Sequence, residues 1–65
     1  MSSHSDSYRL LRIKQVENKT GLKRSQIYAR MKEHAFPASI KIGPASVAWL
    51  EQEIDNWIKE KLDQR

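Results

Sequence analysis

Cysteine is absent from this 65-residue chain, and glycine and proline occur only twice each. Without cysteine, neither a disulfide framework nor a thiolate metal site can stabilise the fold. A chain of this length forms one small, marginally stable domain, so its core must come from apolar side chains. Aromatic residues make up only 8% of the chain. The large side chains expected in the core are Trp49, Trp57, Phe36, Ile54 and Leu22.

Long apolar runs are absent as well. No segment approaches the roughly 20 apolar residues of a membrane span, and residues 1–7 are polar, unlike the apolar centre of a secretory signal. We therefore expect a soluble, cytoplasmic protein with no membrane partner.

The serine-rich residues 1–7 are predicted to form a disordered tail, and residues 8–65 to form the domain.

Acidic residues are few in the first part of the chain. The net charge is +4 and the pI is about 9.7. Residues 1–46 hold nine Lys/Arg and three acids, a net of +6, whereas residues 47–65 hold three bases and five acids, a net of −2. A basic front and an acidic back favour a polyanion on one side, because phosphate neutralisation dominates non-specific nucleic-acid affinity. Mild basicity alone is also common in small proteins that bind no nucleic acid.

The segment from Val16 to Met31 is typical of a helix-turn-helix. We expect a brief edge strand or an extended lead-in within residues 8–13, a first helix over 14–20, and a second helix from Arg24 to Glu33 or His34. Gly21 ends the first helix because it adopts a left-handed conformation without a Cβ clash, and Leu22 fills the angle between the helices. The second helix is expected to end there because Pro37 keeps the residue before it out of the α region.

The second helix has two faces. Ile27 and Met31 repeat at i and i+4 and form its buried stripe. The opposite face carries donor-rich side chains suited to base edges and phosphates in a DNA major groove: Arg24, Ser25, Gln26 and Arg30. Further phosphate contacts, which position without reading sequence, are expected from Lys14, Lys23, Lys32 and Lys41.

Two short apolar runs, residues 40–42 and 47–49, are separated by Gly43 to Ser46 and predict a β-hairpin. Beside a helix-turn-helix, such a hairpin forms a wing that lies along a minor groove or the backbone. A hairpin that merely covers the core is the alternative.

The last segment, Leu50 to Leu62, is predicted to be an amphipathic helix that closes the core. Its apolar arc is Leu50, Ile54, Trp57, Ile58 and Leu62. Acidic residues gather in its first turns and basic residues in its last, which complements the helix dipole. This arrangement explains the carboxylates without a catalytic role.

Taken in order, several segments resemble the AlpA family of prophage regulators over residues 9–60. They are Arg12 to Val16, Thr20 to Tyr28, Phe36-Pro37, Ile42 to Pro44, Val47 to Trp49 and Glu53 to Ile58. The family is similar to phage excisionases and, more distantly, to the MerR-type DNA-binding domain. The resemblance implies a mainly α fold with a small β-hairpin, a winged helix-turn-helix. Such proteins bind double-stranded DNA as transcriptional regulators or as recombination directionality factors that favour excision.

By position, the resemblance assigns Arg24, Ser25, Gln26, Tyr28 and Arg30 to the recognition helix and the segment from Gly43 to Ser46 to the wing turn. Tyr28 has two interpretations, a core aromatic with its hydroxyl at the rim or a phosphate contact. The chain departs from the family at three positions. Lys23 and Leu50 stand where a helix cap would suit, and Ala45 stands where a basic wing residue is common.

Two other functional classes are compatible with a chain of this size. A protein-interaction module would use the acidic last helix, or an exposed part of Trp49, to contact an integrase, a response regulator or a second copy on DNA repeats. An enzyme has little support, because His4 and His34 are isolated and the chain has neither a phosphate-binding glycine loop nor metal-spaced histidines. No cofactor, metal or small-molecule ligand is expected.

Overall fold

Residues 8–65 are described here from a computed structural model. The prediction of a disordered tail concerns residues 1–7, which lie outside the described residues. The elements follow in the order β1 (Leu10–Leu11), α1 (Ile13–Thr20), α2 (Arg24–Lys32), β2 (Ile40–Gly43), β3 (Ser46–Leu50) and α3 (Glu51–Asp63). The mainly α fold with a small hairpin, predicted as a winged helix-turn-helix, is confirmed.

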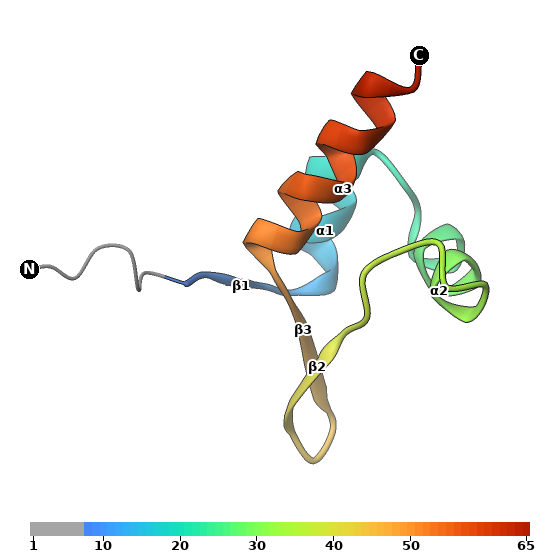
Figure 1. Cartoon of the computed structure of the whole chain (residues 1–65). Coiled ribbons are helices and arrows are strands. Elements are labelled where there is room, and N and C mark those ends of the chain that lie inside the picture. The colour runs from blue at the N-terminus through green and yellow to red at the C-terminus, as the bar shows by residue number, and fades with distance from the viewer. Residues whose placement is uncertain (1–7) are drawn as a thin grey trace, which may run out of the picture.

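The strands form one antiparallel sheet in the order β1-β3-β2. Leu11 pairs with Trp49, and Lys41 pairs with Val47. A register shift between Lys41 and Gly43 places one extra residue, Ile42, on β2. Such a bulge increases the local twist of a hairpin. Figure 1 shows this hairpin projecting beyond the helices, with α2 set apart from α1 and α3.

The core draws one apolar side chain from nearly every element. Trp49, Ile27, Val16 and Ile54 are fully buried, and Leu11 of the two-residue strand β1 is 1% exposed. Each such side chain contributes about 1.5–3 kcal/mol by leaving water. Partly buried apolar residues complete this core, among them Leu22, Met31 and Trp57. The predicted core is therefore confirmed, and Leu11 is a buried member that the prediction did not include.

The apolar arc predicted for the last helix is wrong at its end. Leu62 is 53% exposed, because the C-terminal turns of α3 extend beyond α1 (Figure 1). The helix also starts one residue later than predicted, since Leu50 still pairs with Leu10 in the sheet. The brief edge strand predicted within residues 8–13 is Leu10–Leu11, and α1 begins one residue earlier than predicted, at Ile13.

Two tryptophans hold the loop between α2 and β2. The Trp49 indole N–H donates to the Pro37 carbonyl at 3.1 Å, and the Trp57 indole N–H donates to the Ala35 carbonyl at 2.9 Å. Phe36 lies between these anchors and packs edge-on against Trp57, with ring centroids 4.9 Å apart. The loop therefore has a fixed path from the end of α2 to the hairpin.

An ionic cluster joins α1 to α3. The Lys19 ammonium lies 2.7 Å from Asp55 and 3.1 Å from Glu51, which also contacts Arg9 at 3.5 Å. The two carboxylates act mainly as hydrogen-bond acceptors that raise the pKa of Lys19. The cluster fixes the first helix of the helix-turn-helix against the helix that closes the core.

Candidate nucleic-acid interface

The turn before α2 is built as the sequence predicts, with one addition. Gly21 has φ 77° and donates its N–H to the Glu17 carbonyl at 2.8 Å, which confirms the left-handed glycine. The Thr20 hydroxyl donates to the Val16 carbonyl and accepts the N–H of Leu22. Thr20 thereby satisfies an amide that the turn would leave unpaired, and it fixes Leu22 at the angle between the helices.

The Lys23 side chain accepts no hydrogen bond from the first backbone amides of α2, in agreement with the predicted missing cap. Gln26 instead supplies the reciprocal bond of a capping box, because its Oε1 accepts the backbone N–H of Lys23 at 2.8 Å. The first turn of α1 uses the same device, with Gln15 accepting the N–H of Arg12 at 2.8 Å. In each case a glutamine three residues into the helix holds the preceding basic residue in place.

The electrostatics of this helix start favour an anion. Backbone N–H groups and the helix dipole make an N-terminus positive, and no acidic residue lies in the first turn of α2. Lys23 and Arg24 add two further positive charges there. By contrast, α3 carries Glu51 and Glu53 in its first turn. The start of α2, like that of α1, therefore has a positive charge that no carboxylate of its own first turn offsets.

Arg24 lies on top of an aromatic stack that leads into the core. Its guanidinium carbon is 5.4 Å from the centroid of the Tyr28 ring, and Tyr28 meets buried Trp49 edge-on at 6.1 Å. Tyr28 is 37% exposed. The ring therefore packs as the core-aromatic interpretation requires, while the phosphate contact through its hydroxyl stays a prediction. The stack restricts Arg24 to one side of α2.

The remaining candidate residues fall into two groups. Ser25 and Lys32 are exposed on α2, where Arg30 is half-buried. Lys41 and Ser46 lie on neighbouring strands close to the hairpin turn, which consists of Pro44 and Ala45 alone because Gly43 pairs with Ser46.

The basic side chains on this surface are unpaired within residues 8–65, as are Lys14 and the lysines of α3. Within residues 8–65, every ion pair involves Arg9 or Lys19 with Glu51 or Asp55. The basic side chains of α2 and the hairpin form none, so they are free to contact phosphates: Lys23, Arg24, Arg30, Lys32 and Lys41. We call the exposed surface of α2 and the hairpin, with these residues, the basic face.

A metal site and a membrane span find no support in residues 8–65. No group of three or more His, Asp or Glu side chains there converges as a metal site requires. None of the helices in this range is long and apolar enough to cross a membrane. The suggestion that Trp49 has an exposed part for a partner is wrong, because its side chain is 0% exposed under α2 and β1.

Comparisons with known proteins agree with this fold. Residues 9–62 match the sequence model of the family described as prophage CP4-57 regulatory protein (AlpA). The chain is 35% identical over 54 residues to the uncharacterized protein ORF88 of Enterobacteria phage P4, an alignment that covers 83% of this chain and spans 61% of the phage protein's length. It is 32% identical over 65 residues to the DNA-binding transcriptional activator AlpA of Escherichia coli strain K12, with 91% of this chain and 93% of that protein covered. No solved structure matches significantly.

Proposed function

The chain belongs to the AlpA family of prophage regulatory proteins, and on this premise we propose that it binds a specific site in double-stranded DNA through α2 and the hairpin. The observation that carries the proposal is the basic face, whose five cations have no carboxylate partner among residues 8–65. Unpaired Lys and Arg release counterions from DNA when they bind phosphates, which supplies most of the non-specific affinity.

Sequence reading is assigned to the start of α2. Arg24 presents a planar fork suited to the O6 and N7 atoms of guanine, and Gln26 an amide suited to adenine. The cap bond uses one lone pair of the Gln26 Oε1, so its second lone pair and its NH₂ group are left for a base. Lys23, Arg30, Lys32 and Lys41 position the domain by contacting phosphates.

The biological role we propose is that of a prophage transcriptional regulator. The supporting observation is the similarity to the AlpA activator of E. coli. A recombination directionality factor that favours excision is the second role consistent with this architecture, and it would involve a recombinase or a second copy bound on DNA repeats. The two roles differ in where the bound site lies, at a promoter or at an attachment site.

A DNA titration tests the proposal. The chain is titrated against duplexes tiled across its own genomic neighbourhood and against random duplex of equal length, at two salt concentrations. We expect one native duplex to bind at least tenfold more tightly than random DNA, and this preference to persist at the higher salt. Footprinting of that duplex then separates the two roles. Equal binding to both duplexes that disappears with salt would contradict sequence-specific recognition.

A further inference from the structure

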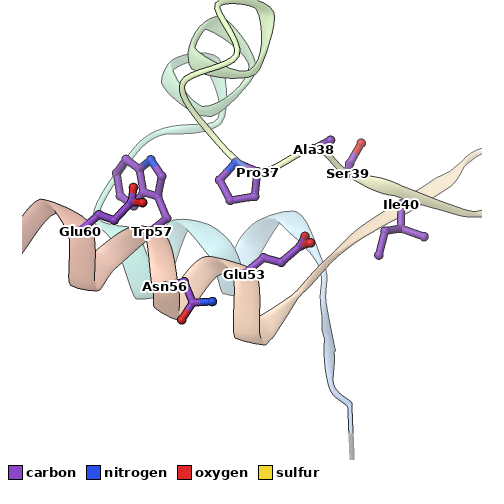
Figure 2. A pocket seen from close by; sticks show the side chains of 8 residues that line it. All are labelled: Pro37, Ala38, Ser39, Ile40, Glu53, Asn56, Trp57 and Glu60. Carbon is purple, nitrogen blue, oxygen red and sulfur yellow. The ribbon is translucent and has the colours of Figure 1, made fainter.

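A groove of about 480 Å³ lies between α3 and the segment that leads into β2. One wall is formed by Pro37 to Ile40, and the other by residues of α3. Figure 2 shows Glu60 beside Trp57 at one end of the groove and Glu53 towards Ile40 at the other, with Pro37 opposite α3. The groove is thus lined by apolar and polar side chains together, with a carboxylate near each end.

Trp57, Pro37 and Ile40 supply the apolar part of this groove, whose lining also includes the polar side chains of Ser39 and Asn56. The Trp57 N–H is already bonded to the Ala35 carbonyl, so the indole offers its ring carbons. Ile40 is 41% exposed at the end of the channel. An apolar side chain placed against Trp57 and Pro37 would leave water without breaking an existing hydrogen bond.

The two carboxylates are unpaired. No ion pair within residues 8–65 involves Glu53 or Glu60. They belong to the part of the chain, residues 47–65, whose net charge is −2. A negative charge repels DNA phosphates and attracts cations. The groove is therefore suited to a basic partner, not to the DNA that we propose for the basic face.

We propose that this groove binds an extended basic segment of a protein partner, with an apolar residue against Trp57 and Pro37 and a Lys or Arg at each end. Glu53 and Glu60 are seven residues apart on α3, a rise of about 10.5 Å. Residues i and i+3 of an extended peptide are separated by about 10 Å. The groove therefore selects two basic residues separated by two others, at least one of them apolar.

One charged neighbour opposes this binding. The Lys61 ammonium lies 5.4 Å from the centroid of the Trp57 ring, so it partly neutralises the carboxylates and covers one ring face. Replacing it should strengthen peptide binding. Lys61→Ala is expected to lower the dissociation constant of a basic peptide about twofold to threefold.

Binding is tested with the full chain, ¹⁵N-labelled, and the peptide acetyl-Arg-Leu-Pro-Arg-amide. We expect the Trp57 indole and Asn56 side-chain amide signals to shift with a saturable curve, while the Gln26 amide signal on α2 does not shift.

Glu53→Gln/Glu60→Gln is expected to weaken peptide binding about tenfold, because two charge-assisted contacts are lost. The control Glu33→Gln/Asp63→Asn removes the same charge from exposed positions outside the groove and should weaken it less than twofold. DNA is absent, so the result is independent of DNA binding.

Four outcomes would overturn the inference. Equal weakening by both double variants would mean that the peptide senses net charge alone. The same binding by acetyl-Arg-Arg-Leu-Pro-amide would remove the spacing requirement. A Trp57 signal that shifts with protein concentration, together with a dimer in sedimentation equilibrium, would assign the groove to a second copy. Duplex DNA that displaces the peptide and shifts Trp57 would assign it to DNA.

Discussion

Arg24 is the residue whose replacement best separates base reading from phosphate contact. Its guanidinium is held over Tyr28, which itself rests on buried Trp49. We expect Arg24→Ala to weaken binding to the native site by about 1–3 kcal/mol, the usual value of one bidentate base contact, and to weaken random DNA much less. Lys32→Ala, an exposed cation later on the same helix, should weaken both equally. Anisotropy titrations with both duplexes measure the difference, and equal losses for Arg24→Ala would remove it from the base-reading set.

His34 carries a conformational cost at the end of α2. It is the non-glycine residue with positive φ in residues 8–65, at 60°. Since L-residues other than glycine pay about 1–2 kcal/mol in this region, His34→Gly should raise the free energy of unfolding by about 1 kcal/mol and the melting temperature by about 5 °C. Thermal denaturation followed by circular dichroism checks this. His34→Ala is the control, because alanine keeps the Cβ and should give no such gain.

Residue roles were predictable only where a residue type has one physical use. Gly21 was assigned correctly because a left-handed turn between two helices favours glycine. Tyr28 had two interpretations, because its contact with Trp49 joins residues 21 positions apart. The sequence predicts that Trp49 lies in the core but not that it is fully buried, since composition does not reveal how completely a large side chain is covered.

At the scale of elements, Lys19 forms the ion pairs that join α1 to α3. Hydrogen bonds to Asp55, then to Glu51, raise its pKa above the ordinary lysine value. A raised folded pKa gives stability that is fully present below the unfolded pKa and lost as pH rises through the folded one. We expect Lys19→Met to melt below the wild type at pH 7 and the gap to shrink above pH 10.5.

The matched control for this cluster is Lys14→Met, because Lys14 is an exposed lysine of the same helix that forms no ion pair within residues 8–65. It should melt with the wild type at both pH values. A gap between wild type and Lys19→Met that persists unchanged at high pH would mean that Lys19 stabilises the helices by packing rather than by charge.

The glutamine caps allow folding to be separated from DNA recognition. Gln15 and Gln26 make the same 2.8 Å bond at the starts of α1 and α2. Each change to alanine should cost about 0.5–1.5 kcal/mol of stability. Only Gln26→Ala is expected also to weaken the native DNA site more than random duplex. Chemical denaturation and DNA titration measure the two effects. If Gln15→Ala reduced specificity as much, the loss would have to come from helix order rather than from a base contact.

Element boundaries show why local signals are incomplete. The second helix was expected to end because of Pro37, and it does end before it, but the cause lies nearer. Ala35 donates to the Arg30 carbonyl and His34 to that of Met31, the bonds of a Schellman cap. That cap has histidine in place of the usual glycine, so no sequence signal marks it.

The exposure of Leu62 was not predictable, because helical periodicity continues beyond the point where neighbouring elements stop covering α3.

At the scale of the whole molecule, net charge divides the chain into a basic and an acidic part. The net charge is +6 in residues 1–46 and −2 in residues 47–65, and this division places the basic face on α2 and the hairpin and the acidic groove on α3. The fold was predictable because hydrophobic spacing, turn glycine and family resemblance all favour the same architecture. The groove was not, because it depends on the path of the α2-to-β2 loop, which two tryptophan hydrogen bonds determine from distant positions.

The central claim is that α2 and the hairpin contact DNA and read its sequence while α3 remains free. Amide chemical-shift mapping of the ¹⁵N-labelled chain with its footprinted duplex, and with random duplex of equal length, tests this most directly. We expect the largest shifts in residues 23–32 and 41–46, a distinct and larger pattern with the native duplex, and little change at Asn56 and Trp57. The largest shifts on α3, or identical patterns with both duplexes, would contradict it.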